Sequence, residues 1–257
     1  MTVTKRFIQD LSRTASLFAL VGLAACAGVP AEPVQPAPDY LAIVKSPERT
    51  EADRAVDPRR QPEKLLEFYG VRSGMRVLDL GASAGYNTEL LARAVGPDGL
   101  VYAQNSAFFL ENIVKGRLAE RMKRPAMGNV VPLAREFDDP VPQDLRNLDL
   151  ATLNFVYHDT VHLGVDRARM NRAVYDALKR GGIYIVADHS AKPGVGTSAT
   201  KTLHRIEESV VRKEVEAAGF RFVASADFLR NPQDSRDVPP FKNTVPNDEF
   251  VLKFVKP

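Results

Sequence analysis

The feature that most constrains the fold is the stretch from Met75 to Val95, which reads MRVLDLGASAGYNTELLARAV. Its first residues are mostly apolar, as in a strand buried in a parallel sheet. A glycine-rich turn, Gly81 to Gly85, follows, and leucines then recur at helical spacing behind Asn87 or Thr88, either of which we expect as the helix N-cap. Glycines let a backbone approach a ligand, and a helix N-terminus presents unpaired N–H groups. The stretch therefore predicts a strand, a turn and a helix that form an α/β ligand site, with Asp79 at the strand tip.

The composition is that of one domain with extensions. The chain has 257 residues, of which 44% are hydrophobic and 26% charged, with a net charge of +3; this suits one domain of about 200 residues. Lys5, Arg6 and Arg13 lie near the N-terminus, so the remainder is close to neutral. Because the sequence has no basic run with interleaved aromatic residues, we expect no nucleic-acid partner.

The N-terminus resembles a bacterial lipoprotein signal. After the basic residues an apolar run, Thr14 to Ala25, ends in LAAC at Cys26, the only cysteine; the run is too short for a stop-transfer helix. By this resemblance, residues 1–25 are a signal peptide, residues 26–45 a lipidated proline-rich tether, and residues 46–257 the folded domain. Ala27 favours the outer membrane, so we expect an exported protein facing the periplasm and held by its N-terminal lipid alone. The alternative is an ordinary signal peptide with an incidental cysteine.

Residues 46–257 alternate between strand and helix patterns. A polar segment, residues 46–60, and a short helix, residues 62–69, precede the first strand. The later strands are expected at residues 100–104, 130–134, 148–155, 182–187, 220–226 and 250–255, and the helices at residues 108–123, 166–179 and 201–218. This alternation predicts a doubly wound, mostly parallel α/β sheet.

Asp79 and the segment Gly81-Ala82-Ser83-Ala84-Gly85 resemble the first motif of class I S-adenosylmethionine (SAM) methyltransferases, an acidic residue followed by Gly-x-Gly-x-Gly. Ser83 replaces the middle glycine, which would cost about 1–2 kcal/mol if that position needs a positive φ. The resemblance covers residues 62–257. The C-terminal half resembles a group of predicted bacterial methyltransferases of undefined substrate, several with export signals. The segments that carry this resemblance are residues 158–159, 188–189, 202–208, 213–220 and 227–232. The resemblance to class I methyltransferases implies a seven-stranded Rossmann-like sheet whose last strand is antiparallel.

The same resemblance implies SAM as the cofactor. The strand tip and the glycine turn would face its methionine part, the end of the second strand its ribose, and the loop after the third strand its adenine. Most class I enzymes carry an acidic residue toward the ribose, whereas this chain has two amides, a change that could weaken binding about tenfold. The expected cofactor-binding residues are Asp79, Gly81, Ser83, Gly85, Gln104, Asn105 and Asp138, with Asp139 as the alternative to the last.

A group of titratable residues follows the fourth and fifth strands. Because neighbouring strands lie about 4.8 Å apart, these residues should converge at the edge where open α/β sheets bind ligands. His204 has Glu207 and Glu208 three and four residues later, which would place a second His–carboxylate pair on one helix face. His162 is interpreted as a loop residue. The expected catalytic residues are His158, Asp159, Asp188, His189 and His204, and the expected pocket-lining aromatic residues are Tyr86, Phe155 and Tyr157.

Three roles are open to this group. One histidine could be the general base for the methyl acceptor, or the group could only shape a pocket. It could also hold a divalent metal, because Asp159 and Asp188 fall where metal-dependent O-methyltransferases carry their aspartates. However, His189 stands where those enzymes have an asparagine, and Mg²⁺ prefers oxygen ligands; no metal ligand is therefore assigned.

The favoured function is SAM-dependent methyl transfer to a small-molecule or otherwise unidentified acceptor. One alternative is a lipoprotein that binds a ligand or partner on a methyltransferase scaffold without catalysis. A more distant one is a serine hydrolase, because residues 81–85 also fit Gly-x-Ser-x-Gly with Ser83 as the nucleophile.

Overall fold

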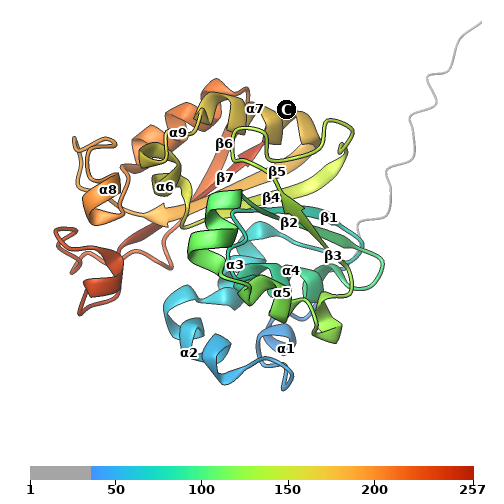
Figure 1. Cartoon of the computed structure of the whole chain (residues 1–257). Coiled ribbons are helices and arrows are strands. Elements are labelled where there is room, and N and C mark those ends of the chain that lie inside the picture. Colours follow the sequence, from blue (N-terminus) through green and yellow to red (C-terminus); the bar gives the residue numbers. More distant parts are fainter. Residues whose placement is uncertain (1–35) are drawn as a thin grey trace, which may run out of the picture. The chain divides into compact units, whose positions relative to one another are not determined.

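A seven-stranded sheet forms the centre of residues 36–257, the part of the chain that the structure, a computed structural model, describes (Figure 1). The strands are β1 (Arg76–Leu80), β2 (Leu100–Asn105), β3 (Val130–Ala134), β4 (Leu148–Asn154), β5 (Leu178–His189), β6 (Arg221–Ala226) and β7 (Glu249–Val255). Their order is β3-β2-β1-β4-β5-β7-β6. Strands β1 to β5 pair in parallel, whereas β7 is antiparallel to β5 and β6. The predicted sheet and its antiparallel last strand are confirmed.

Helices cover both faces of the sheet. One face carries α3 (Pro62–Tyr69), α4 (Tyr86–Val95) and α5 (Arg117–Arg121); the other carries α6 (Tyr157–His162), α7 (Arg167–Ala177) and α9 (Glu208–Ala217). Successive strand residues point to opposite faces. Val77 therefore belongs to the core with Leu91 of α4, and Leu78 to the core with Val174 of α7. Burial of both faces explains why β1 reads as an apolar run.

Two helices precede α3 where the sequence predicts a tether and a polar segment. Helix α1 (Tyr40–Val44) is attached through the Tyr40 hydroxyl, which donates to the Val71 carbonyl at 2.7 Å. Helix α2 (Glu51–Arg60) is capped by Thr50 Oγ1, which accepts from the Asp53 N–H at 3.1 Å. Asp53 is the only buried residue of α2, so its sequence carries no apolar periodicity.

The expected signal peptide and Cys26 lie outside the described residues, as does the tether up to residue 35. Within residues 36–257, no helix is long and apolar enough to cross a membrane. The described part also contains three short helices, η1 (Phe109–Val114), η2 (Pro125–Met127) and η3 (Pro240–Lys242).

The single helix predicted over residues 108–123 is wrong. The structure has η1, a π-helical turn, and then α5, because Lys115 and Gly116 adopt left-handed conformations with φ of 47° and 80°. This break turns α5 toward the glycine turn, where Arg121 Nε donates to the Ala84 carbonyl at 2.8 Å. A tertiary contact thus overrides the local helical pattern.

The single helix predicted over residues 201–218 is also wrong. It is divided into α8 (Thr200–Leu203) and α9 by His204, whose φ is 50°. The following residue, Arg205, is fully buried and pairs with Asp234 at 2.9 Å, a contact that a continuous helix would not allow. The expected His–carboxylate helix face is therefore absent from this segment, since Glu207 accepts from the Gly196 N–H and Glu208 pairs with Arg230.

Candidate functional site

The buried carboxylate of Asp79 organises the turn between β1 and α4. Its Oδ1 accepts hydrogen bonds from Asn87 and Thr152, each at 2.8 Å, and its Oδ2 accepts one from Thr88 at 2.6 Å. Burial raises the pKa of Asp79, and these three bonds oppose the rise. Helix α4 begins after Gly85, so the predicted N-cap at Asn87 or Thr88 is wrong: both side chains are used to hold Asp79.

The two amides at the end of β2 hold the same turn from below. Gln104 Oε1 accepts from the Gly81 N–H at 2.9 Å, and its Nε2 donates to the Arg135 carbonyl at 2.6 Å. Asn105 Oδ1 accepts from the Ser83 N–H at 2.8 Å, and its Nδ2 donates to the Ser83 carbonyl at 3.2 Å. Both side chains are buried, so the structure places these expected ribose-facing residues beneath the turn.

Three positions of the turn have positive φ: Gly81 at 65°, Ser83 at 53° and Gly85 at 84°. Ser83 therefore occupies the left-handed region that a glycine would adopt freely at the middle position of Gly-x-Gly-x-Gly, at a cost of about 1–2 kcal/mol. A Cβ at Gly85 would lie 2.8 Å from Leu118 Cδ1, so this glycine is needed for the close approach of α5.

A network of ion pairs joins the turn to α2. Arg121 lies 2.6 Å from Asp53 and 2.7 Å from Glu89, and Arg124 also contacts both carboxylates. Burial alone would raise the pKa of Asp53, but the hydrogen bonds from Arg121 and Thr50 hold it well below its usual range. This network fixes α2 beside the glycine turn.

A cavity of about 240 Å³ lies between the turn and helices α2 and α3, lined by residues 81–84 and by Asp79. Two of its lining residues carry buried donors without a hydrogen-bond partner in residues 36–257: Arg60 Nη1 and Asn154 Nδ2. The Arg60 guanidinium also lies 3.4 Å from the Phe155 ring centroid. Burial lowers the pKa of Arg60 to about 10, which leaves it charged at neutral pH. An acceptor group bound in this cavity would satisfy both donors.

The tips of β4 and β5 converge, as the sequence predicts. His158 Nδ1 lies 2.7 Å from Asp188 Oδ1, and His158 Nε2 lies 3.1 Å from Asp159 Oδ1. Asp188 also accepts from the backbone N–H groups of His158 and His189 at 2.8 and 2.7 Å. Burial lowers the pKa of His158, but Asp188 and Asp159 outweigh it and raise the pKa to about 10. His158 is therefore an imidazolium at neutral pH.

Two further histidines approach Asp159. His204 Nδ1 lies 3.5 Å and His162 Nε2 3.7 Å from Asp159 Oδ1. The interpretation of His162 as a loop residue is wrong, because it ends α6 and faces Asp159. The sequence did not predict α6, which directs Asp159 and His162 toward each other soon after β4 ends.

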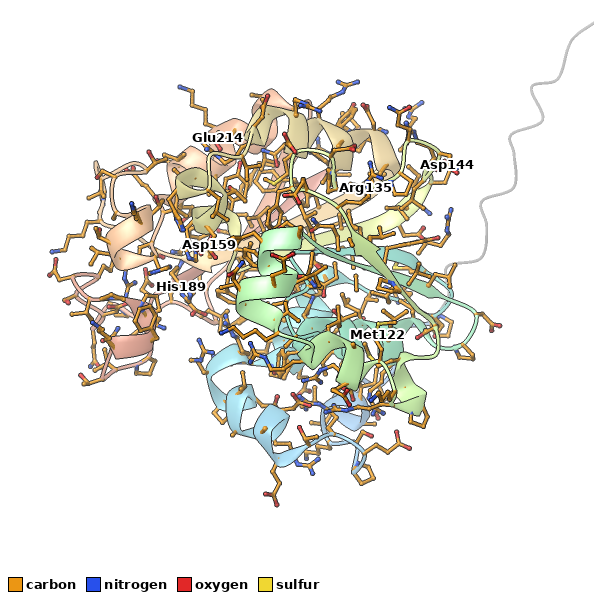
Figure 2. The ribbon with its side chains drawn as sticks, viewed as in Figure 1. Met122, Arg135, Asp144, Asp159, His189 and Glu214 are labelled. Carbon is orange, nitrogen blue, oxygen red and sulfur yellow. The ribbon has the colours of Figure 1, made fainter. Side chains whose placement is uncertain are left out.

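His189 faces β7 instead. Its Nδ1 lies 2.9 Å from Glu249 Oε1, yet neither atom has a hydrogen-bond partner among the described residues. Burial lowers the pKa of His189 well below its ordinary value and raises the pKa of Glu249 to about 7. His189 is therefore a neutral imidazole beside a carboxyl group that titrates near neutral pH. Figure 2 labels His189 and Asp159 at this edge of the sheet.

A second pocket, of about 330 Å³, opens over these side chains. His158, His189 and His204 line it, and it shares Arg59 and Phe155 with the first cavity. Phe155 has a φ of 61°, a strained conformation for a bulky residue that the surrounding structure must hold in place. The outer wall includes Phe241, which is 71% exposed. The two cavities therefore adjoin at Phe155.

The remaining predicted residues lie in different places. Asp138 pairs with Arg169 at 3.5 Å and lines neither of the two cavities. Tyr157 is buried in the core, so of the three expected aromatic residues only Tyr86 and Phe155 line a cavity.

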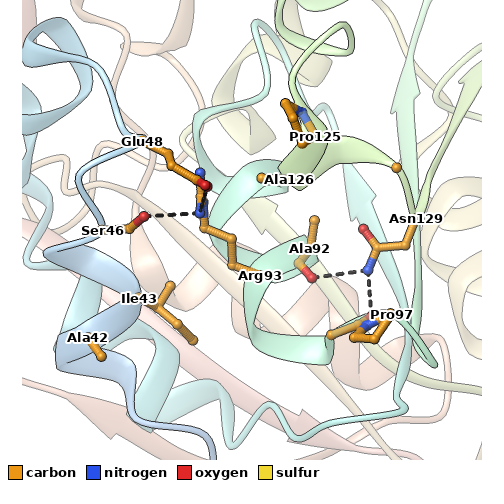
Figure 3. Close-up of a pocket in the computed structure, with 12 residues that line it drawn as sticks. Ala42, Ile43, Ser46, Glu48, Ala92, Arg93, Pro97, Pro125, Ala126 and Asn129 are labelled. Carbon is orange, nitrogen blue, oxygen red and sulfur yellow. Dashed lines mark hydrogen bonds and ion pairs between the residues drawn. The ribbon is translucent and has the colours of Figure 1, made fainter.

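Another hollow, of about 650 Å³, lies near the C-terminal end of α4, away from the strand tips (Figure 3). Its polar side chains are already paired. Arg93 contacts Ser46 Oγ at 3.1 Å and Glu48 at 2.9 Å, and Asn129 donates to the carbonyls of Ala92 and Gly96. Among the residues shown, this hollow therefore has no set of unpaired polar groups that point together at a ligand.

Comparison with known proteins shows that residues 41–126 match the protein-L-isoaspartate(D-aspartate) O-methyltransferase family. A protein-L-isoaspartate O-methyltransferase of Pyrobaculum arsenaticum is 25% identical over 211 residues, or 80% of this chain and 93% of that protein. A ubiquinone/menaquinone biosynthesis C-methyltransferase of Vibrio campbellii is 28% identical over 49% of this chain and 45% of that protein.

Among solved structures, a SAM-dependent methyltransferase from Aquifex aeolicus superposes with a TM-score of 0.57 at 19% identity, covering 80% of this chain and 97% of that one. The chain therefore has the fold of the class I SAM-dependent methyltransferases. The [4+2]-cyclase SpnF has the same fold. It superposes with a TM-score of 0.56 at 17% identity, covering 80% of this chain and 81% of that one. The methyltransferase fold alone therefore does not define the reaction.

The matched part of this methyltransferase-fold chain covers 34%, 45% and 63% of the length of three curated relatives.

The sequence motif marks the turn, but the residues that distinguish this site lie elsewhere. Arg60, Asn154 and Glu249 are ordinary polar residues in sequence, and only their positions at a helix end and at strand ends near the turn could have indicated a role.

Proposed function

We propose that the protein is a SAM-dependent methyltransferase that binds SAM in the cavity beside the β1–α4 turn and the methyl acceptor in the pocket over the tips of β4 and β5. The observation that carries the proposal is a pair of buried donors without a hydrogen-bond partner in residues 36–257, Arg60 Nη1 and Asn154 Nδ2, in the cavity that the glycine turn lines. Arg60 Nη1 makes only a long ion pair with Glu249 Oε1, at 3.9 Å. Buried polar groups normally have partners, so these two donors indicate a ligand with an acceptor group.

The chemistry of the first cavity fits SAM. The two donors without a hydrogen bond, Arg60 Nη1 and Asn154 Nδ2, suit the carboxylate of the methionine part. Hydrogen bonds that involve an ionised group are the stronger ones. Tyr86, which also lines the cavity, is an aromatic side chain of the kind that attracts a positively charged sulfonium. SAM, when bound, supplies an electrophilic methyl group; the side chains that line the cavity bind and orient it.

The contact between the two cavities supports transfer. Methyl transfer requires the acceptor atom in line with the methyl group, so the protein acts largely by positioning. Phe155 and Arg59 line both cavities, and the strained backbone of Phe155 is typical of a residue held for function.

Within the second pocket we assign His189 as the general base. It is neutral, whereas His158 already carries a proton on each nitrogen and cannot accept another. The Glu249 carboxyl group, 2.9 Å away, would stabilise the imidazolium that forms after His189 takes the acceptor proton. Asp159, Asp188 and His158 then hold the shape and charge of the pocket.

Two other assignments remain as proposals of lower rank. Binding without catalysis is favoured by the replacements Ser83 and Gln104 in the cofactor motif. We also keep the proposal that the protein is exported and lipid-anchored at Cys26, from the N-terminal pattern alone. A serine hydrolase has no such support, since Ser83 makes no hydrogen bond to a histidine within residues 36–257.

The test is transfer of labelled methyl from SAM into the small-molecule and protein fractions of an extract of the source cells. Wild type should label at least one fraction. His189→Gln should lose about 10²–10⁴-fold in rate while it binds SAM as wild type does. Labelling that is absent from every fraction, with SAM bound, would favour the non-catalytic alternative.

A further inference from the structure

Three side chains at the edge of the second pocket bring metal-binding atoms together. His158 Nε2 lies 3.1 Å from Asp159 Oδ1, and His204 Nδ1 lies 3.5 Å from the same oxygen. One ligand atom from each residue lies within 4.8 Å of the other two. Ligands held 2.0–2.2 Å from a tetrahedral ion are about 3.3 Å apart. Two of the separations therefore already match the spacing that one ion requires, and the group as a whole is compact enough to close around it.

We propose that His158, Asp159 and His204 bind one divalent first-row transition-metal ion, such as Zn²⁺. The ion takes the place of the Nε2 proton that His158 carries in the metal-free protein, and this proton is released to solvent. Two imidazoles and one carboxylate suit Zn²⁺ and its neighbours, whereas Mg²⁺ prefers an all-oxygen shell. The sequence places all three residues in one candidate group but does not single them out as ligands. The third ligand follows the first two by more than forty residues and lies in a segment where the pattern predicts an unbroken helix.

Asp188 supplies a second, independent indication. Metal-bound histidines commonly donate their other ring N–H to a carboxylate, which fixes the tautomer and the ring orientation. Asp188 Oδ1 lies 2.7 Å from His158 Nδ1, and the side chain is fully buried. With Nδ1 held in this way, Nε2 of the same ring is directed at Asp159. Both Asp188 oxygens are occupied by His158 and the His189 N–H, so Asp188 is a supporting residue and not a ligand.

The backbone directs the third ligand into the group. His204 lies between α8 and α9 in the left-handed conformation. The next residue, Arg205, anchors this break through its buried pair with Asp234 and a hydrogen bond to the Ser190 carbonyl. His204 is thus held against Asp159 although it lies far along the chain from the other ligands.

Three protein ligands leave one coordination position open, as in catalytic zinc sites. His158 and His204 both line the second pocket, so an acceptor in that pocket could supply the fourth ligand through oxygen, nitrogen or sulfur. This role in methyl transfer rests on the proposed function, whereas binding of the ion does not.

The experiment measures bound metal on untagged full-length protein. The protein is loaded with Zn²⁺, dialysed against metal-free buffer and analysed by elemental mass spectrometry, and the affinity is measured by competition with a chromophoric chelator. Wild type should retain one ion per chain. Asp159→Asn and His204→Ala should each weaken binding at least 100-fold, and Asp188→Asn should weaken it about 10–100-fold. Circular dichroism confirms that each variant is folded.

His189→Gln is the matched control, because the His189 ring centroid lies 5.7 Å from that of His158 while its Nδ1 faces Glu249. It should bind Zn²⁺ as wild type does. Co²⁺ replacing Zn²⁺ should give visible absorption of a four- or five-coordinate ion, lost in His204→Ala. Wild type without stoichiometric metal, or with metal that the Asp159 and His204 variants retain, would overturn the proposal. SAM binding separates the two claims: SAM bound without metal refutes only the site, and metal bound without SAM refutes only the proposed function.

Discussion

Nδ1 of His158 and Oδ1 of Asp188 lie 2.7 Å apart in a pair that is almost wholly removed from solvent. The two residues come from neighbouring strand tips, and Asp188 accepts two backbone N–H groups besides the ring. One carboxylate therefore fixes the course of both chain segments that enter the second pocket.

This relationship predicts a large loss of stability on removal of Asp188. Asp188→Ala leaves a buried imidazolium and two backbone donors without their acceptor, so the free energy of unfolding should fall by about 3 kcal/mol or more. Urea denaturation measures the change. Asp227 is exposed, and Asp227→Ala should stay within about 0.5 kcal/mol of wild type. Equal, small effects for the two variants would refute the structural role of Asp188.

The strained turn predicts a stabilising substitution. Ser83→Gly removes the left-handed penalty, and the greater freedom of glycine in the unfolded chain offsets part of the gain. The net gain should be about 0.5–1 kcal/mol by thermal or urea unfolding, with SAM affinity unchanged or improved. The control is Ser225→Gly in β6, where φ is not positive; there glycine should destabilise by about 0.5–1 kcal/mol. A loss at Ser83 equal to that at Ser225 would contradict the prediction.

The buried carboxyl group on β7 predicts a pH dependence of stability. Burial raises the pKa of Glu249 to about 7 from an unfolded value near 4.5, although Arg60 and Arg59 oppose the rise. Between these values the folded protein keeps a proton that the unfolded chain has lost, so this group makes stability fall as pH rises from 4.5 through 7.

Glu249→Gln removes that dependence. Between pH 4.5 and pH 8, the free energy of unfolding of the variant should rise by about 3 kcal/mol relative to that of wild type. Urea unfolding across that pH range measures the change. Exposed Glu111 provides the control, and Glu111→Gln should follow the wild-type curve. If the difference between Glu249→Gln and wild type does not change with pH, folding does not shift the pKa of Glu249 and the prediction is wrong.

The proposed lipoprotein signal predicts where the protein is found. Several acyl chains, each contributing about 0.8 kcal/mol per buried methylene, would hold it stably on a membrane. Fractionation of source cells should recover wild type with the outer membrane and Cys26→Ser in a soluble or uncleaved form. A wild-type protein that stays uncleaved in the cytoplasm would refute export, and would also remove the difficulty of supplying SAM outside the cytoplasm.

The sequence was sufficient for the sheet because the apolar runs, the glycine turn and the strand–helix alternation are local signals. It was also sufficient for the convergence of His158 with Asp188, since parallel neighbouring strands must end at the same edge. It failed where tertiary contacts override local pattern. Buried Arg205 breaks the helix at His204, and Arg121 draws α5 onto the turn. It did not predict the contacts of Gln104, because a polar residue at a strand end can face a ligand or support the backbone, and in the structure Gln104 holds the turn.

The central claim is that the cavity beside the β1–α4 turn binds SAM, and titration calorimetry of the purified protein tests it most directly. SAM and its demethylated product should each bind with one site per chain. Asn154→Ala should weaken the binding of both compounds several-fold, because it removes the Nδ2 donor that has no hydrogen-bond partner in residues 36–257. The control is Asn112→Ala, at an exposed position on η1, which should bind both compounds as wild type does. Absence of binding heat for both compounds across a range of temperatures, with folded wild-type protein, would contradict the account.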